Sequence, residues 1–321
     1  MSEAVWKNAK FFAGQYDFSG KLNALGLDYS AETPEKTAMR DVNKTRLPGL
    51  KDIGFSLNGH FDAENPDKWF FDNMSLSQVP MTMAETGLDA GACFIFQPIL
   101  AQYSPGGKVG DVMAFSVKGN GNGDLIKGTI LYPKTTKTAS DTGTEQQLGS
   151  VSTNRIGTFT ISAAGSGYSI ADTLTVVQVG GSGGTLRVNT VGGSGEVLTA
   201  TLITPGNGYA IAAGLATTVS PNNGSGCELD ILTLGKDQQV HALLHVFSAS
   251  AGDTLDVKVQ SDVDDTFASA TDVITFAQAT AAGSELKTAD GPVTDTWWRV
   301  SFTIAGNGSE SFSFAVSFGI L

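Results

Sequence analysis

The chain is poor in cysteine, histidine and positive charge. Its 321 residues include two cysteines, Cys93 and Cys227, three histidines, and 20 basic against 32 acidic residues, which gives a formal net charge of −12. Two distant cysteines do not make a disulfide framework, so we expect free buried thiols and synthesis in the cytosol. The shortage of clustered Lys and Arg argues against a protein that grips nucleic acid. The acidity fits a surface that DNA passes without sticking, and it fits simple solubility equally well.

Long apolar runs are also missing. No stretch approaches the length needed to cross a bilayer, and the first residues lack the apolar core of a signal peptide. We therefore expect no membrane association and no export by a classical signal. The charged fraction is only 16%, and 39 glycines with abundant Thr, Ser and Val favour strands and turns over helices. A chain of this length predicts two or three domains.

An alternation of apolar and polar residues dominates what is present. It is clearest from Trp298 to Ile304 and from Phe312 to Phe318, with a Gly/Asn turn between them. Apolar residues at every second position predict strands with one buried face, and we expect these two to form a C-terminal β-hairpin. The same period recurs, in the ranges 16–29 (with a β-bulge near Ala24 and Leu25), 53–61, 94–100, 113–117, 126–132, 240–246, 255–259 and 273–278. Asn65 and Pro66 predict the start of one short helix. The prediction is a mainly all-β fold, a sandwich or barrel with a short flanking helix.

The period disappears between residues 30 and 52. This segment carries several of the basic residues of an otherwise acidic protein, among them Arg40, Lys44, Arg46 and Lys51. An unpatterned connection of about 20 residues in a compact domain is usually functional or disordered. We favour an arm that reaches a neighbouring subunit over an unstructured loop.

Residues 153–234 differ in composition from both flanks, with almost no aromatic residues and dense Gly, Thr and Val. They hold an internal repeat, because Gly165–Ile170 (GSGYSI) returns as Gly206–Ile211 (GNGYAI), and Gly181–Leu186 returns as Gly224–Leu229. We predict an inserted small β-domain at 153–234. The host is then a first β-sandwich at 1–136, with its long loop at 30–52, and a second β-sandwich built from 137–152 plus 235–321.

Few residues suggest chemistry. His241 and His245 lie on one face of a predicted strand, about 13 Å apart at ~3.3 Å per residue, which is too far to share a metal. The glycine-rich stretch Gly119–Gly123 lacks the lysine and helix of a phosphate-binding loop, so we interpret it as a hairpin tip. Three carboxylates form an acidic turn without the glycine and glutamate of a calcium loop: Asp262, Asp264 and Asp265. We find no nucleophile beside a base, and we expect no enzyme activity, cofactor or metal.

The tryptophans are candidates for contacts between subunits. Trp297 and Trp298 point to opposite faces of a strand, so one is expected in the core and the other exposed or in an interface. Exposed aromatic residues on β-sandwiches anchor subunit contacts or stack on sugars, and we favour the interface. Trp69, on the predicted helix, is the third candidate.

Four strings, in this order, give the chain a resemblance to a known family: Gly14–Gly20 (GQYDFSG), Gly54–Phe61 (GFSLNGHF), Tyr103–Asp111 (YSPGGKVGD) and Asp295–Val300 (DTWWRV). Together they resemble tail tube (major tail) proteins of long-tailed bacteriophages, over residues 1–150 and 236–321 but not over the insert. The resemblance implies a β-sandwich with a flanking helix, whose inner strands pair between subunits into a barrel.

The resemblance also implies stacked rings that form a tube for DNA ejection, in the virion tail and with other tail proteins as partners. DNA would meet the chain only in transit, and residues 30–52 would be an inter-ring loop. A ring would hold six chains, or three with pseudo-hexameric symmetry if both sandwiches adopt the tube fold. The alternatives are a capsid decoration protein, a fibre or adhesin protein with a glycan-binding β-sandwich, and a secreted glycan-binding protein.

Overall fold

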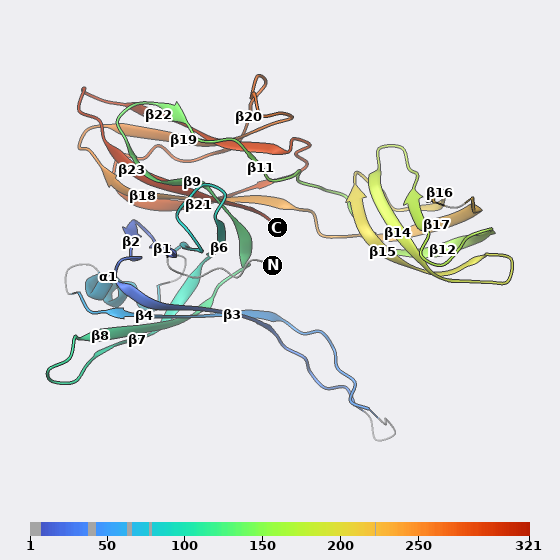
Figure 1. The fold of residues 1–321 in the computed structure, drawn as a ribbon, viewed down its shortest axis with the longest axis horizontal. Helices are drawn as coiled ribbons and strands as arrows, with labels where there is room; N and C mark the ends of the chain where they lie inside the picture. Colours follow the sequence, from blue (N-terminus) through green and yellow to red (C-terminus); the bar gives the residue numbers. More distant parts are fainter. Residues whose placement is uncertain (1–7, 38–42, 63–65, 77–78, 222) are drawn as a thin grey trace. The chain divides into compact units, whose positions relative to one another are not determined.

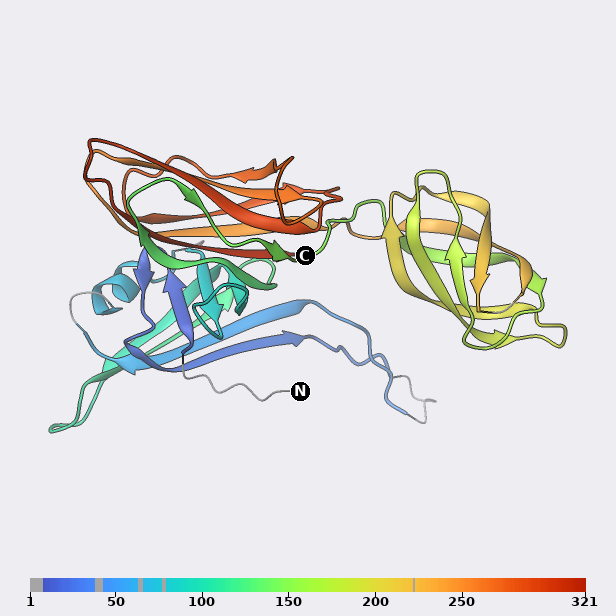
Figure 2. The same cartoon turned by 45° about the horizontal axis from the view of Figure 1, so that its top comes forward.

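The computed structural model describes residues 8–37, 43–62, 66–76, 79–221 and 223–321 (Figures 1 and 2). The chain is nearly all β, as predicted, and it divides into two compact units. Unit 1 contains Met1–Gln147, His241–Thr288 and Trp297–Leu321, and unit 2 contains Leu148–Val240 and Ala289–Thr296. Each unit has its own core.

Unit 1 contains three sheets, two of which pack on a shared third. The outer sheet has the order β3 (Leu22–Ala31), β4 (Lys51–His60), β8 (Ala114–Gly121) and β7 (Pro98–Gly106). The shared sheet has the order β2 (Tyr16–Asp17), β1 (Lys10–Ala13), β5 (Met81–Ala84), β6 (Ala92–Phe96), β9 (Ile126–Lys137), β23 (Phe312–Ile320), β18 (Gln239–Ala249) and β21 (Gly283–Asp290). The third sheet has the order β10 (Asp141–Thr142), β22 (Trp297–Ala305), β19 (Thr254–Asp262) and β20 (Thr271–Thr275), and β11 (Gln146–Gln147) also pairs with β22.

The first half of the shared sheet and the outer sheet enclose an aromatic core. Phe18 and Phe70 stack at 5.1 Å, and Phe70 also contacts Phe115 at 5.5 Å between ring centroids. The helix α1 (Pro66–Asp72) supplies Trp69 and Phe70 to this core, and it starts at the predicted proline. No helix in the described part of the chain is long and apolar enough to cross a membrane.

The second half of the shared sheet packs on the third sheet. Trp298 of β22 and Phe318 of β23 meet across this core, with ring centroids 4.8 Å apart. The predicted C-terminal hairpin is therefore wrong, because β22 pairs with β19 while β23 pairs with β9 in the opposite sheet. The alternating pattern marks each strand correctly, but it carries no information on which neighbour a strand takes.

Two further local predictions need correction. Gly119–Gly123 is not a hairpin tip, because β8 pairs with β4 and β7 whereas the next strand, β9, belongs to the shared sheet. The single strand predicted at 94–100 is two strands, β6 and β7, which lie in different sheets. In contrast, the predicted bulge is confirmed, as a register shift between Leu22 and Ala24.

A chain of buried polar groups closes the shared sheet on itself. The imidazole Nδ1 of His245 (β18) lies 2.6 Å from the carbonyl oxygen of Gly14, and Nε2 lies 3.0 Å from the hydroxyl of Thr82 (β5). The Thr82 hydroxyl is also 3.0 Å from that of Ser317 (β23). Since β6 and β9 separate β5 from β23 in the sheet order, the sheet must curl to bring these groups together.

Unit 2 contains one six-stranded sheet with internal two-fold order. Its strands run β12 (Ile156–Ser166), β17 (Ser225–Leu234), β16 (Ala212–Ser220), β13 (Thr173–Val176), β14 (Ser182–Val191) and β15 (Val197–Asn207). The first repeat contains β12, β13 and β14, and the second contains β15, β16 and β17. If each strand is exchanged with its counterpart in the other repeat, the strand order reverses and every pairing stays the same. The outer strand of each repeat pairs with the last strand of the other, β12 with β17 and β15 with β14. Because the two copies exchange strands in this way, two repeats suffice to build one module.

The repeated glycines and tyrosines have equivalent roles in both copies. Gly165 and Gly206 adopt φ values of 60° and 64°, in the left-handed region that glycine tolerates. The buried hydroxyl of Tyr168 accepts the Cys227 amide at 3.1 Å, and that of Tyr209 accepts the Gly184 amide at 2.9 Å. Both cysteines of the chain are free and buried, as predicted.

We expect Tyr209→Phe to destabilise unit 2 by about 1–3 kcal/mol, because it leaves the buried Gly184 amide without its acceptor. Tyr168→Phe should have a similar effect through Cys227. Hydrogen exchange of the unit 2 amides measures both, and Tyr29→Phe, on an exposed tyrosine, is the control. Equal exchange rates in all three variants would show that these hydroxyls do not hold the repeat together.

Unit 2 also includes a segment that the sequence did not assign to it. The stretch Ala289–Thr296 pairs with the base of the module, through a bridge between Val151 and Val293 and a hydrogen bond of 2.7 Å from Gln239 to Asp290. In unit 1 the two predicted host sandwiches share one eight-stranded sheet. The domain boundaries at 136, 152 and 234 stay predictions.

Candidate assembly surface

The outer sheet of unit 1 has one apolar and one polar face. Phe55, Leu57 and Val117 are buried on its inner face against the aromatic core. The alternate positions of β4, β8 and β7 are exposed or half-buried, and apart from Ile99, which pairs with Asn120, they carry small or polar side chains: Ser56, Asn58, Ser116, Lys118, Asn120 and Gln102. A sheet face with a single large apolar residue, and with few charges, does not bind another apolar surface strongly.

Both edges of this sheet lack a second strand partner among the described residues. β3 is an edge strand of ten residues and β7 is an edge strand of nine. β3 contains no proline, whereas β7 has Pro98 and Pro105. Exposed strand edges of this length offer backbone hydrogen bonds to another chain unless something covers them.

The segment between β3 and β4 is ordered as an extension of their hairpin. Beyond the last strand pair, Ala31 with Lys51, the Glu32 amide donates to the Leu50 carbonyl at 2.8 Å, and the Lys36 amide donates to the Thr45 carbonyl at 2.7 Å. Nearly all described side chains of this arm, residues 32–37 and 43–50, are exposed. The arm runs beyond the outer sheet in Figure 1, by about 16 Å from Ala31 to Lys36 at ~3.3 Å per residue. Apolar and polar residues do not alternate along the arm because neither of its faces is buried within this chain.

The predicted basic residues of this segment contact the arm or the strands that carry it. Lys44 pairs with Glu35 at 3.0 Å, and hydrogen bonds from Thr37 and Lys44 lower the pKa of the Glu35 carboxyl. Arg46 donates to Thr33 at 3.2 Å, and the Lys51 ammonium lies 5.6 Å from the centre of the Tyr29 ring. Arg40 lies outside the described residues. Exposed pairs of this kind contribute little to stability, so a partner surface can replace them at small cost.

The hairpin between β7 and β8 ends at the opposite end of the same sheet. We call residues 107–113 the tip. The Asp111 amide donates to the Lys108 carbonyl at 3.0 Å, and Gly110 has a φ of 97°, so the tip contains a tight turn with glycine where the turn requires it. Val109, Val112 and Met113 are exposed on the tip.

The three candidate tryptophans differ in exposure. Trp298 is fully buried and Trp69 is 9% exposed, both within the cores of unit 1. Trp297 is half-buried. A contact with another subunit or with a sugar therefore has only Trp297 of the three to use, and the assignment of the tryptophans to an interface stays a prediction.

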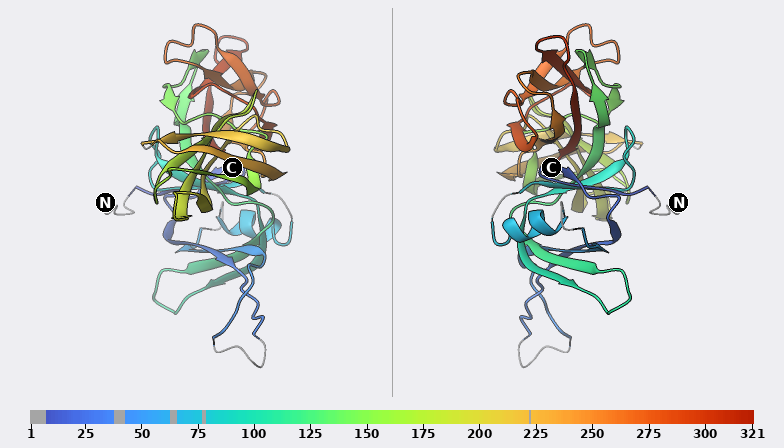
Figure 3. Two further views of the ribbon diagram at one scale, coloured as in Figure 1. Left: turned by 90° about the vertical axis from the view of Figure 1, so that its right-hand side faces the viewer. Right: turned by 90° about the vertical axis from the view of Figure 1, so that its left-hand side faces the viewer.

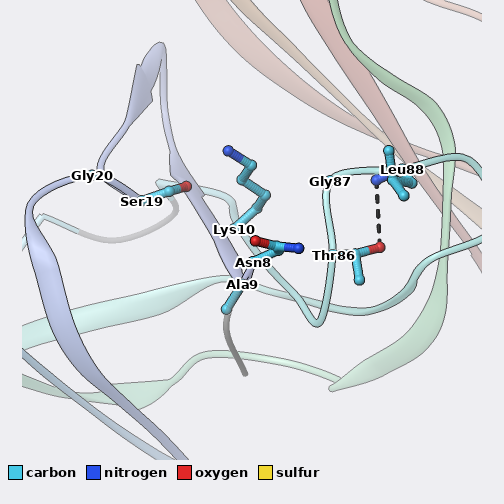
Figure 4. Close-up of a pocket in the computed structure, with 8 residues that line it drawn as sticks. All are labelled: Asn8, Ala9, Lys10, Ser19, Gly20, Thr86, Gly87 and Leu88. Carbon is cyan, nitrogen blue, oxygen red and sulfur yellow. Dashed lines mark hydrogen bonds between the residues drawn. The ribbon is translucent and has the colours of Figure 1, made fainter. Parts of the chain in front are cut away.

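A shallow cavity of about 410 Å³ lies near the start of β1 (Figure 4). Its lining includes Asn8, Lys10, Ser19, Thr86 and Leu88. The Thr86 hydroxyl accepts the Leu88 amide at 3.4 Å. The lining contains no carboxylate, histidine or cysteine, so it offers no acid–base pair and no metal ligand set.

Two carboxylates of the acidic turn accept hydrogen bonds from neighbouring residues. Asp262 accepts the amides of Val263 and Ser269 at 2.6 and 2.8 Å, and Asp264 accepts the amide and hydroxyl of Thr266. The two bonds from Thr266 lower the pKa of the Asp264 carboxyl. Within the described ranges, no three His, Cys, Asp or Glu side chains gather closely enough to hold a metal ion.

No protein-family model and no curated protein sequence matches this chain. Among solved structures, the tail of an empty gene transfer agent particle with C6 symmetry aligns at 16% identity and a TM-score of 0.29, over 39% of this chain and 97% of that one. The sheath–tube complex of an extracellular contractile injection system aligns at 15% identity and 0.32, over 40% and 93%. The SPP1 Dit protein, from the hub adsorption apparatus of phages that infect Gram-positive hosts, aligns at 10% identity and 0.32, over 98% and 100%. At these TM-scores the alignments define neither the fold nor the role of this chain.

Proposed function

We propose that this chain is a structural virion protein without catalytic activity, and that its copies assemble into the stacked rings of a phage tail tube. One observation carries the proposal: among the described residues neither edge strand of the outer sheet, β3 or β7, has a second strand partner, and the two are of nearly equal length. The Ser75 amide, which donates to the Leu100 carbonyl of β7 at 3.0 Å, would have to give way to a neighbouring strand. Pairing β3 of one copy with β7 of the next extends the sheet around a ring and removes both edges. The sequence resemblance to tail tube proteins points in the same direction.

The polar face of the outer sheet suits the inside of such a ring. Its central strands present Ser56, Asn58, Ser116 and Asn120, with Lys118 as a cation. DNA binds tightly where many phosphates are neutralised by Lys and Arg, so a polar lining with sparse cations lets it slide. We assign this face to the lumen and DNA to transit only.

We assign the arm to the contact between rings. Lys44, Arg46 and Lys51, together with Arg40, would then exchange their contacts within the arm for carboxylates of an acidic neighbour. Unit 2 would decorate the outside of the tube, where an added module does not obstruct the lumen.

The ring would contain six chains rather than three. In the described residues the only helix, α1, belongs to the first half of unit 1, and the second half has no counterpart of the arm. Each chain would therefore occupy one position in the ring, through the first half of unit 1, which argues against a duplicated tube fold. Mass measurement of isolated rings distinguishes the two numbers.

The purified full-length chain should form long hollow filaments at high concentration, visible by negative-stain electron microscopy. A lysine on either edge strand, Ala24→Lys or Ala101→Lys, should abolish filaments, because an edge lysine opposes strand pairing. Asn120→Lys adds the same charge on the central strand β8 and should leave filaments intact. Protein that stays monomeric, binds capsids as small oligomers or stops at single rings contradicts the tube assignment.

A further inference from the structure

We propose that the apolar side chains of the arm dock on the tip and α1 of a second copy of this chain, head to tail. This inference rests on the proposed function and adds to it the surface that receives the arm. The observation behind it is that the arm and the tip leave the same sheet at its two opposite ends (Figure 1; Figure 3 views the chain along this direction).

Strand register establishes that the two ends are opposite. The arm joins the start of β4 at Lys51, and the tip joins the start of β8 at Ala114. Ala114 pairs with His60, the last residue of β4. Nine residues of extended chain separate Lys51 from His60, about 30 Å at ~3.3 Å per residue. Contact between arm and tip is therefore impossible within one copy and requires two.

Both surfaces expose aliphatic or aromatic side chains. Leu50 of the arm is 79% exposed, and Leu47 beside it is exposed as well. At the other end, Val112 of the tip is 73% exposed and Phe71 of α1 is 71% exposed. Exposed apolar residues that cluster are typical of interaction sites, whereas single ones need no explanation.

The receiving end is held in place by the core beneath it. Phe70, next to Phe71, stacks on Tyr103 of β7 at 6.1 Å, and the Tyr103 hydroxyl donates to Asp67 of α1 at 2.6 Å. The tip itself is fixed by its tight turn and by the Phe61 amide, which donates to the Met113 carbonyl at 2.8 Å. A preformed surface loses little conformational freedom on binding, which favours docking.

The geometry selects a second copy as the occupant. A contact between two different patches at opposite ends of one molecule repeats without closing, and so builds an open stack. A contact of arm with arm would close as a pair and stop. Docking of arm on tip is the arrangement that allows rings joined at their edges to stack indefinitely.

The test uses the full-length double variant Leu50→Cys with Val112→Cys, oxidised after assembly. The native thiols, Cys93 and Cys227, are buried, and the wild-type chain shows how much disulfide cross-linking they give on their own. A disulfide needs Cα atoms within about 7 Å, which excludes a bond within one chain. We expect a ladder of covalent multimers, and no ladder from either single variant. The control pair, Leu50→Cys with Val263→Cys, places the second thiol on a 68% exposed residue of the β19–β20 loop and should give no ladder.

A second measurement does not depend on disulfide chemistry. Val112→Asp should raise the protein concentration needed for filaments at least tenfold, whereas Val263→Asp should leave it unchanged. Filaments that form without a ladder, or a ladder from the control pair, overturn the docking of arm on tip while the tube assignment stands. Dimers from Leu50→Cys alone show arm-to-arm contact and also overturn it. If the wild-type chain forms no filaments at all, the proposed function fails, and this inference fails with it.

Discussion

Replacing Gly128 with alanine is expected to destabilise unit 1 by at least about 3 kcal/mol, or to prevent folding altogether. Gly128 lies on β9 and pairs with Cys93 of β6 on one side and Gly319 of β23 on the other. A β-carbon at this position would lie 1.9 Å from the carbonyl oxygen of Phe318, on the β23 backbone. Backbone cannot move aside as a side chain can, so β9 and β23 would have to separate.

The position of this contact makes the effect large. β9 and β23 join the two halves of the shared sheet, so their separation exposes both cores of unit 1. Thermal unfolding followed by circular dichroism measures the change, which corresponds to a melting temperature lower by about 10 °C. Gly283→Ala is the matched control, because Gly283 lies on β21 of the same sheet and has open space around its α-carbon. Equal melting temperatures for the two variants would mean that β9 and β23 are not paired in this register.

Strand positions were predictable from the sequence because burial of one face leaves a two-residue period. The stretch from Trp298 to Ile304 follows this rule, and the structure places Trp298, Val300 and Phe302 in a core. The repeat in unit 2 was predictable for a related reason. Its glycines adopt left-handed backbone and its tyrosines fill equivalent positions, so both copies keep the same letters.

Strand partners were not predictable from the same pattern. β22 and β23 are neighbours in the sequence and look like a hairpin, yet they lie in opposite sheets. The side chains that face the core are the same for either arrangement, so periodicity does not distinguish them. The membership of Ala289–Thr296 in unit 2 was not predictable from the sequence. Its contacts with unit 2 are made by backbone groups and by Gln239, and such contacts produce no pattern of apolar residues.

The candidate assembly surface was predictable only in part. Lys44, Arg46 and Lys51 marked this segment by their charge, but Lys44 and Arg46 bind other residues of the arm and Lys51 lies against Tyr29 of β3. For the tip, the sequence predicted a turn but not an exposed apolar surface, because Val109 and Val112 resemble strand residues. Their exposure becomes visible only when the fold shows that no layer covers them.

Unit 1 is expected to lose stability as the pH falls from about 6.5 to about 4, through His245. Burial lowers the pKa of its imidazole from 6.5 to about 4, against smaller opposing effects of the Gly14 carbonyl and Asp17. Between these values the unfolded chain binds a proton at this histidine and the folded chain does not. Unfolding therefore takes up a proton, and acid favours it. The contribution is fully present above pH 6.5 and is lost as the pH falls to about 4, by about 3 kcal/mol in total.

The local bonding explains why the folded protein resists this proton. The Gly14 carbonyl can only accept, so Nδ1 carries the hydrogen, and Nε2 accepts from the Thr82 hydroxyl. A second proton on Nε2 would turn that acceptor into a donor, displace the Thr82 hydroxyl and disturb its bond to Ser317. The neighbouring Asp17 is already paired with Lys134 at 2.9 Å, which limits its ability to balance a new positive charge.

Urea unfolding at pH values from 7.5 to 4 measures this effect, by comparing the wild type with His245→Gln. The variant should be less stable at pH 7.5 because the ring contacts with Phe12 are lost, but its stability should change much less with pH. Carboxylates with lowered pKa values, such as Asp17, titrate at lower pH and are common to both proteins, so they cancel in the difference. His60→Gln, at an exposed position, should keep the wild-type slope. Parallel pH profiles for the wild type and His245→Gln would mean that His245 is not the group that couples acid to the opening of the shared sheet.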